Sequence, residues 1–394
     1  MNIVIDVRCL NEYPLTGVPT YAIAVLNNLF SLDKTNNYLL FNNTYYSENE
    51  NLKFLIAQWT KNQNVRYFNL HWPNKILNFL LKFKLVCLDK ILSRRNIIEK
   101  IDCWWSPNMN YLNLSSNIKL LLTVHDLSFH LFPDFYSFKE RLWHWGIGYK
   151  KLFQRANRLL SVSQSTAHDL QSLGIPVEKI KVLPLGVETS VFYKIVDENK
   201  LSDFKQKYNL PERFFIFVAT LGARKNLKLL IEAWLGLPAT ARRACRLLLI
   251  GKKTAYWETL SRDRWGGGRR NYDQLWGDVG IRIFSDATPG DLPYFYNLAE
   301  VLVYPSCYEG FGLPPLEALA CACPVIVGGN SALLENFSEA ITIDVDNPDE
   351  LQDLLFAFVH GKINKELAFP KSFNVEKYSW KNYAENLLNL MESL

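Results

Sequence analysis

The sequence predicts an α/β protein with two doubly wound parallel-sheet domains that face a cleft. A chain of 394 residues, 48% of them hydrophobic, is longer than one compact core usually requires. Short apolar runs alternate with longer helical stretches, and this pattern starts twice, near residues 3 and 213. Between the two halves, the proline and glycine of KVLPLGV (181–187) follow a strand-like run and mark a hinge.

The first half is expected to contain strands at 3–7, 38–41 and 119–124, with a helix at 20–30. The second half is expected to contain strands at 213–220, 246–250, 281–284 and 301–304, with helices at 225–235 and 315–322. We predict domains at 1–187 and 188–372, and a closing helix at 373–394 that crosses back to the first domain. Because open parallel sheets bind ligands beyond the carboxyl ends of their strands, the candidate loops are 9–20, 125–133, 221–226, 251–257 and 307–314.

Charge, cysteine spacing and the length of the apolar stretches limit the classes of protein to which this chain can belong. The net charge of +5 is mild and the signs are mixed, so no nucleic-acid partner is expected. The seven cysteines are scattered without paired CxxC spacing, and no apolar stretch approaches the roughly 18 residues of a membrane span. The first residues carry no secretion signal. These features favour a cytoplasmic protein.

The stretch 301–327 (VLVYPSCYEGFGLPPLEALACACPVIV) is the most informative. It reads as a buried strand, a loop with two glycines, a helix and another buried strand. The glycines leave backbone amides open to a ligand, and the helix start adds a positive dipole end that suits an anion or a sugar hydroxyl. Glu309 lies in the loop, and Glu317 lies near the start of the helix.

In this context the pair Glu309 and Glu317 resembles the signature of retaining glycosyltransferases of family 4, which have the GT-B fold of two Rossmann-like domains. The resemblance extends over nearly the whole chain and is greatest to bacterial mannosyl- and rhamnosyl-type transferases of polysaccharide assembly. The further matching motifs are LTGVPTY (with Gly17), TVHDLSFHLFPDF (with His125 and Asp126), SVSQST, IPVEKIKVLPLGV, ATLGARKN (with Arg224 and Lys225) and SWKNYAENLL.

The resemblance implies a role for each matching residue. Arg224 and Lys225 would bind the donor diphosphate and stabilise it as it leaves, in place of the divalent metal that other transferases use. Glu309 would contact the transferred sugar, Glu317 the ribose hydroxyls, and His125 the donor sugar and the acceptor site. The implied catalytic set is His125, Arg224, Lys225 and Glu309, and the implied donor-binding set is Gly17, Arg224, Lys225, Glu309, Gly310, Phe311, Gly312, Leu313 and Glu317.

The activity implied by the resemblance is transfer of a hexose, with mannose from GDP-mannose as first choice, to a glycan or lipid-linked glycan of a cell-surface polysaccharide or lipopolysaccharide. The only ligands expected are the nucleotide-sugar donor and the acceptor, with no cofactor and no metal. Asp344 and Asp346 form a DxD far from any glycine loop and are interpreted as a surface turn. Two alternatives stay open: a nucleotide-sugar epimerase or hydrolase of the same fold, and a non-catalytic scaffold for a transferase.

The segment 75–95 lies in a locally basic region and reads as an amphipathic helix with a broad apolar face. Such a helix could lie on an anionic membrane and bring the enzyme to a lipid-linked acceptor at the inner face of the cytoplasmic membrane. It could equally pack its apolar face into the first domain. The sequence leaves these two alternatives open.

Overall fold

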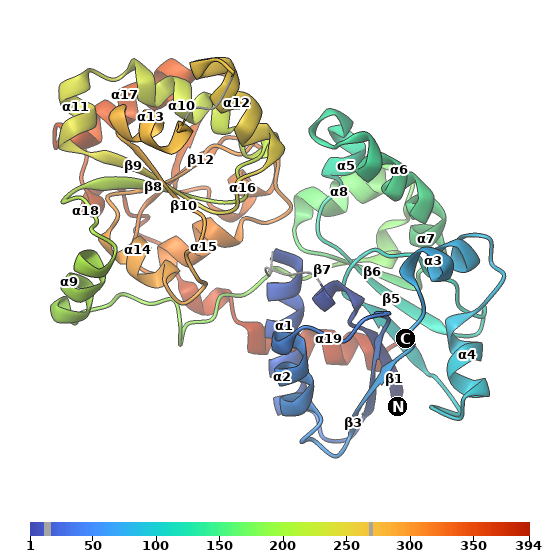
Figure 1. The fold of residues 1–394 in the computed structure, drawn as a ribbon. Helices are drawn as coiled ribbons and strands as arrows, with labels where there is room; N and C mark the ends of the chain where they lie inside the picture. Colours follow the sequence, from blue (N-terminus) through green and yellow to red (C-terminus); the bar gives the residue numbers. More distant parts are fainter. Residues whose placement is uncertain (12–16, 268–270) are drawn as a thin grey trace. The chain divides into compact units, whose positions relative to one another are not determined.

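The computed structural model describes residues 1–11, 17–267 and 271–394, and the chain forms two compact units (Figure 1). Unit 1 comprises Met1–Gly186 together with Tyr378–Leu394, and unit 2 comprises Val187–Lys377. The chain therefore leaves unit 1 once and returns to it with its last helix. Each unit is described below by itself.

Unit 1 is built on a parallel sheet that has seven strands within the described residues, in the order β3-β2-β1-β4-β5-β6-β7. Its strands are β1 (Asn2–Asp6), β2 (Asn37–Asn42), β3 (Val65–Asn69), β4 (Cys103–Ser106), β5 (Lys119–Val124), β6 (Arg158–Ser161) and β7 (Ile180–Val182). Central strands are buried on both faces, which is why β1 and β5 read as continuous apolar runs rather than as alternating patterns.

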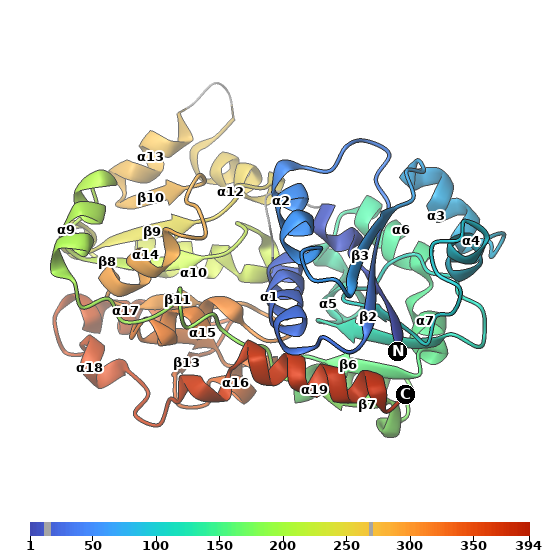
Figure 2. The same cartoon turned by 90° about the horizontal axis from the view of Figure 1, so that it is seen from below.

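Helices and short 3-10 turns connect these strands. The helices are α1 (Gly17–Leu32), α2 (Glu50–Trp59), α3 (Asn74–Lys82), α4 (Leu88–Arg94), α5 (Ser128–Leu131), α6 (Phe138–Ile147), α7 (Tyr149–Arg155), α8 (Gln164–Ser172) and α19 (Trp380–Glu392), and the 3-10 turns are η1 (Arg8–Asn11), η2 (Pro133–Phe135) and η3 (Val177–Lys179). Leu77 and Leu81 of α3 and Leu88 and Leu92 of α4 pack with Val4 and Trp104 in one core. Helix α19 packs on α1 (Figure 2).

The contact between α1 and α19 is polar at its centre. The Tyr21 hydroxyl lies 2.7 Å from the Tyr383 hydroxyl and 3.1 Å from Thr123 Oγ1, and both tyrosines are buried. A Cβ on Gly186 would come within 2.6 Å of the Trp380 backbone nitrogen, so only glycine fits where the first segment of unit 1 meets its last helix. The closing helix is therefore part of the unit 1 core.

Unit 2 repeats the architecture with a parallel sheet of six strands within the described residues, in the order β10-β9-β8-β11-β12-β13. Its strands are β8 (Phe214–Val218), β9 (Arg246–Ile250), β10 (Ile281–Phe284), β11 (Leu302–Tyr304), β12 (Val325–Gly328) and β13 (Ile341–Ile343). Its helices are α9 (Glu198–Lys207), α10 (Leu227–Gly236), α11 (Ala239–Ala244), α12 (Ala255–Trp265), α13 (Tyr272–Asp278), α14 (Leu292–Leu298), α15 (Leu313–Ala320), α16 (Ser331–Asn336), α17 (Pro348–Val359) and α18 (Lys365–Ala368), with the 3-10 turns η4 (Ala223–Lys225) and η5 (Val375–Lys377). The predicted fold class, two doubly wound parallel sheets, is confirmed.

The prediction of one amphipathic helix over 75–95 is wrong. Helix α3 ends at Lys82, Lys84 has a left-handed backbone with φ 57°, and α4 begins only at Leu88. A left-handed residue cannot continue an α-helix, so the chain turns at this point. Leu88 and Leu92 of α4 are buried in the unit 1 core, whereas part of the apolar surface of α3 stays exposed. Among the described residues, none of the helices combines the length and apolar character that crossing a bilayer requires.

Candidate functional site

The order of the strands indicates where each unit binds a ligand. In a doubly wound sheet, the loops on either side of the point where the strand order reverses point in opposite directions and leave a crevice between them. In unit 1 this point lies between β1 and β4, and in unit 2 it lies between β8 and β11. The residues that follow these four strands are therefore the first candidates.

In unit 2, Arg224 and Lys225 follow β8 on the turn η4. Asn226 comes next with a left-handed backbone, φ 54°, and its side-chain amide donates to the Val345 carbonyl at 2.7 Å. Asparagine tolerates this conformation better than most residues do. The turn thus ends sharply, and α10 begins directly after the two cations.

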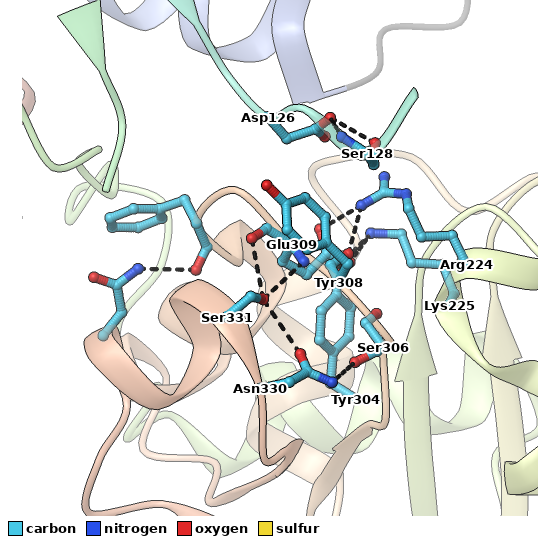
Figure 3. A network of polar contacts seen from close by, with 12 residues as sticks. Asp126, Ser128, Arg224, Lys225, Tyr304, Ser306, Tyr308, Glu309, Asn330 and Ser331 are labelled. Atoms are coloured by element: carbon cyan, nitrogen blue, oxygen red, sulfur yellow. Dashed lines mark hydrogen bonds and ion pairs between the residues drawn. The ribbon is translucent and has the colours of Figure 1, made fainter. Parts of the chain in front are cut away.

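Glu309 follows β11 in the neighbouring loop. Its backbone N–H donates to Ser331 Oγ at 3.1 Å, and Ser331 stands at the start of α16, after β12. The side chain is only 6% exposed. The ends of three adjacent strands, β8, β11 and β12, therefore supply the residues around this carboxylate (Figure 3).

The Glu309 carboxylate binds both cations. Arg224 donates from its guanidinium to Glu309 Oε2 at 3.0 Å and to the Tyr308 carbonyl at 2.9 Å, while Lys225 Nζ donates to Glu309 Oε1 and, at 2.7 Å, to the Tyr304 hydroxyl (Figure 3). Burial raises the pKa of Glu309, but the two cations outweigh burial and hold the pKa at about 2. Glu309 is therefore ionised, and these three side chains together carry one net positive charge.

The loop after Glu309 needs glycine at position 312. Gly312 has φ 101°, and a Cβ there would lie 2.8 Å from Leu333 Cδ2 and 3.0 Å from Phe337. Gly310 and Phe311 are buried, and Leu313 begins α15. Residues 314 and 315 are both proline and lack the N–H group, so they add no backbone donor at the start of α15. The donors that this loop can offer are thus limited to the amides up to Leu313.

Glu317 has a different environment from Glu309. It lies on α15, and its Oε2 accepts a hydrogen bond at 3.1 Å from Tyr296 on α14. Burial raises the pKa of its carboxyl to about 7, and the bond from Tyr296 offsets only part of this effect. A group that donates two hydrogen bonds to this partly exposed carboxylate, such as a vicinal diol, would stabilise its ionised form.

In unit 1, His125 directly follows β5, and the Tyr21 ring contacts it edge-on at 4.7 Å between ring centres. Its Nε2 lies 2.8 Å from the Pro107 carbonyl, so Nε2 carries the proton and Nδ1 is the acceptor nitrogen. Burial lowers its pKa below 6.5, and the imidazole is neutral at pH 7. The next residue, Asp126, accepts from the Ser128 N–H at 2.9 Å and thus caps the following segment.

Gly17 begins α1, and among the described residues no atom lies within 4 Å of the position that a Cβ would take. Residues 15 and 16 of the same motif lie outside the described residues. Gly17 and His125 belong to unit 1, and the other predicted site residues belong to unit 2. Within unit 2, Arg224, Lys225 and Glu309 come together, whereas Glu317 interacts with Tyr296.

The prediction missed a second feature, at the strand-order reversal of unit 1. A pocket of about 230 Å³ is lined by Asp6, Arg8, Cys9, Asn108, Met109, Asn110 and Trp143. Arg8 and Asp6 form a buried ion pair, with Nη2 2.6 Å from Oδ2, and Arg8 also donates to the Tyr111 carbonyl at 2.9 Å. The available sequence signal was a polar residue at the end of the first strand, Asp6, followed by Arg8, because that strand is central in a doubly wound sheet.

Two Rossmann-like sheets, each with polar residues at its reversal point, agree with the GT-B class of proteins, and the similarity to solved structures given below supports this class. Comparison with known proteins gives the family: residues 54–191 match the model for glycosyltransferase family 4, and residues 198–370 match the model for glycosyl transferases group 1. The two models match consecutive parts of one chain and together cover most of it. The chain therefore belongs to the family 4 type of glycosyltransferases and is a glycosyltransferase.

Its relatives include O-antigen chain mannosyltransferase B of Escherichia coli, which is 24% identical over 97% of both chains. Serotype-specific mannosyltransferase WbdA of Escherichia coli is a longer protein, and the match to it is 30% identical. This match covers 59% of this chain and 28% of WbdA. Among solved structures, Anabaena HepE in complex with UDP and glucose matches with a TM-score of 0.73 and 14% identity over the full length of both chains. WaaG, a glycosyltransferase involved in lipopolysaccharide biosynthesis, matches with a TM-score of 0.69 and 14% identity over 99% of each chain.

Proposed function

We propose that this glycosyltransferase transfers a mannosyl residue from GDP-mannose to a glycan or lipid-linked glycan, with retention of the anomeric configuration and without a metal ion. The observation that carries the proposal is the cluster of Arg224, Lys225 and Glu309 at the strand-order reversal of unit 2. The names of the two Escherichia coli mannosyltransferases support the sugar. GDP as the nucleotide is an expectation from the family resemblance.

The cluster has the chemistry that a leaving diphosphate requires. A guanidinium and an ammonium group on one short turn can each donate charge-assisted hydrogen bonds to phosphate oxygens. In this role they would replace a divalent cation, which neutralises the same developing charge in other enzymes. Glu309 holds both cations in position, and its carboxylate oxygens can also accept hydrogen bonds from sugar hydroxyls.

Glu317 fits the nucleoside end of the donor. Its partly exposed carboxylate accepts a hydrogen bond from Tyr296 on one oxygen, and burial raises its pKa to about 7, so further hydrogen-bond donors would stabilise its ionised form. A ribose diol would supply two hydrogen-bond donors. The assignment therefore agrees with the environment of the residue.

The acceptor is proposed to bind unit 1. The pocket beside Asp6 and Arg8 combines an aromatic face, from Trp143, with the side-chain amides of Asn108 and Asn110. Aromatic rings and amides in this combination suit the apolar faces and the hydroxyls of a sugar. Asn108 of the pocket directly follows Pro107, and the Pro107 carbonyl accepts a hydrogen bond from His125.

The proposed chemistry is a displacement on the front face of the sugar. The acceptor oxygen attacks C1 from the side on which the diphosphate leaves, the C1–O bond to the diphosphate breaks, and a donor phosphate oxygen takes the acceptor's proton. A double-displacement mechanism would instead need a carboxylate nucleophile paired with a second carboxyl about 5 Å away. Glu309 already binds two cations, so we assign it to binding rather than to nucleophilic attack. The enzyme is proposed to work in the cytoplasm, at the inner face of the membrane.

The test is thermal stabilisation of the purified protein by GDP, UDP, dTDP and their sugars, with and without EDTA. We expect GDP and GDP-mannose to raise the melting temperature equally with and without EDTA. Arg224→Ala should weaken donor binding about 10- to 100-fold, because a charge-assisted hydrogen bond contributes about 1.5–3 kcal/mol. Lys228→Ala is the matched control, because Lys228 is an exposed cation on the adjacent helix α10.

The outcomes separate the alternatives. Stabilisation by UDP or dTDP alone would overturn the choice of GDP, and a requirement for a divalent cation would overturn the metal-independent mechanism. Breakdown of the donor without any acceptor would favour a hydrolase. If none of the nucleotides stabilises the protein, the scaffold alternative gains.

A further inference from the structure

Helix α3 exposes one apolar face although its other face is buried. Ile76, Phe79 and Phe83, just past its end, stand at positions i, i+3 and i+7, and their side chains are 55%, 57% and 56% exposed. On the opposite face Leu77 and Leu81 are buried in the core. Packing in the core therefore explains why one face of α3 is apolar, but it does not explain the apolar residues on the exposed face.

Helix α6 shows a second exposed apolar row. Phe138, Leu142 and Trp145 stand at positions i, i+4 and i+7, so they share one face, and their exposed fractions are 75%, 52% and 68%. Single exposed apolar residues are normal on a protein surface. Two rows of exposed apolar residues on adjacent helices do require an explanation, because they lie in one area of the surface.

The two rows belong to one surface. Lys82 Nζ of α3 lies 4.2 Å from the centre of the Trp145 ring of α6, which is a cation–π contact. Both views of the fold show α3 and α6 side by side within unit 1 (Figures 1 and 2). We call the surface formed by Ile76, Phe79, Phe83, Phe138, Leu142 and Trp145 the α3–α6 face.

The segments that carry this face are basic. Residues 74–86 contain three lysines and no acidic residue. Residues 138–151 contain four basic residues and a single acid, Glu140, whose carboxylate is used to cap α6 at Ser137. The two segments that carry the apolar rows thus each have a net positive charge.

We propose that the α3–α6 face docks on an anionic lipid bilayer. Exposed phenylalanine and tryptophan side chains among lysines are the combination that partitions into the headgroup region of such a bilayer, because the rings enter the acyl boundary while the cations meet lipid phosphates. A protein partner would need a matching acidic surface around an apolar centre, whereas an anionic membrane presents both at every position. The assignment is independent of the proposed donor and linkage.

Helix α6 contributes residues both to the α3–α6 face and to the unit 1 pocket. Trp143, which lines the pocket, lies on the same helix as Trp145. Helix α6 can approach the pocket loop closely because residue 146 is glycine: a Cβ there would lie 2.1 Å from the Tyr111 hydroxyl. If the pocket binds the acceptor, as proposed above, docking through this face would bring it near the membrane surface where a lipid-linked acceptor lies.

The experiment is flotation of the full-length protein with vesicles of phosphatidylcholine alone, or of phosphatidylcholine with phosphatidylglycerol, at low and high salt. We expect binding to the anionic vesicles that weakens as salt rises. Both Phe79→Ser/Phe83→Ser and Lys75→Glu/Lys84→Glu should reduce the partition coefficient about tenfold or more. Phe54→Ser, which removes a 63% exposed phenylalanine from α2, should leave it unchanged.

Melting temperatures and stabilisation by GDP-mannose are measured on every variant, and the four side chains are exposed, so both should stay at the wild-type values. A loss of vesicle binding with donor binding intact then separates this proposal from the proposed function. Equal binding to neutral and anionic vesicles, or unchanged binding by Phe79→Ser/Phe83→Ser, would overturn it. A concentration-dependent dimer that this variant abolishes, without vesicle binding by the wild type, would assign the face to a second copy instead.

Discussion

Glu309 and Arg224 are 85 residues apart in sequence, yet the guanidinium of Arg224 donates to the Glu309 carboxylate at 3.0 Å. Lys225 binds the other carboxylate oxygen, and the pair of cations keeps a buried acid ionised. An ionised side chain in this position has to be matched by its partners, because an unpaired buried charge is costly. We therefore expect this contact to stabilise unit 2, in addition to its proposed role in donor binding.

We predict that Glu309→Gln lowers the melting temperature at pH 7 and flattens the acid dependence of stability. The folded-state pKa of Glu309 is lowered from 4.5 to about 2, so its contribution to the free energy of unfolding is complete above pH 4.5 and is lost as the pH falls toward 2. The difference between wild type and variant in urea unfolding should thus shrink from pH 5 to pH 3. Glu212→Gln, at an exposed ion pair, is the control. A constant difference at all pH values would contradict the assignment.

A second prediction concerns the pH dependence of donor binding. The Glu317 carboxyl has a pKa of about 7 in the free protein, and ribose hydroxyls would favour its ionised form. The affinity for GDP-mannose should therefore rise up to about pH 7 and then level off, with proton release on binding below pH 7. Calorimetry with GDP-mannose is preferable to GDP because the terminal phosphate of GDP itself titrates in this range.

Glu317→Gln should bind the donor more weakly and without this pH dependence. The same slope in the variant as in the wild type would show that another group titrates. Tyr296→Phe removes the hydroxyl that donates to Glu317, and it should shift the inflection to higher pH, because that hydrogen bond lowers the pKa of the carboxyl.

A third prediction separates positioning from contact at His125. In His125→Gln the amide nitrogen can replace Nε2 and still donate to the Pro107 carbonyl, whereas Nδ1 is lost. We expect kcat to fall about tenfold or more, with the melting temperature and the affinity for GDP-mannose near wild type. Because its pKa is lowered below 6.5, His125 should not produce an inflection between pH 7 and 8. Wild-type kcat in this variant would remove His125 from the catalytic set.

A fourth prediction tests the glycine before α15. In Gly312→Ala the new methyl group meets Leu333 and Phe337, and the backbone stays in a region unfavourable for alanine, so a loss of about 3 kcal/mol is expected. The melting temperature should fall by about 5–10 °C. Gly277→Ala is the matched control, since Gly277 lies on α13 and no atom of the described part of the chain comes within 4 Å of its Cβ position. Helix propensity favours alanine there, so its melting temperature should be unchanged or higher.

The sequence predicted the fold because its signals are local. Buried strands such as β8 and β11 are short apolar runs, and the loops that follow them carry Arg224, Lys225 and Glu309 within a few residues. Their pairing was not predictable in the same way, because it requires β8 and β11 to be neighbours across an 84-residue separation. Arg8 donates to the Tyr111 carbonyl across a sequence separation of 103 residues. For the same reason, the unit 1 pocket was not predicted.

The errors also have local causes. Helical periodicity continues through Lys84, but periodicity does not report the left-handed backbone that ends α3 and separates it from α4. Ser331 shows no pattern of its own, and only the fold brings it to Glu309.

The return of the chain to unit 1 has a consequence for how the protein is made. During synthesis the first 186 residues emerge before unit 2, but the unit 1 core lacks α19 until residues 380–392, which follow unit 2 in the sequence, have left the ribosome. Until then the surface that will receive Trp380 and Tyr383, including Tyr21 and Gly186, is open. Unit 2 is contiguous in sequence and can fold before unit 1 is complete. The unit that begins first along the chain is therefore the one that finishes last.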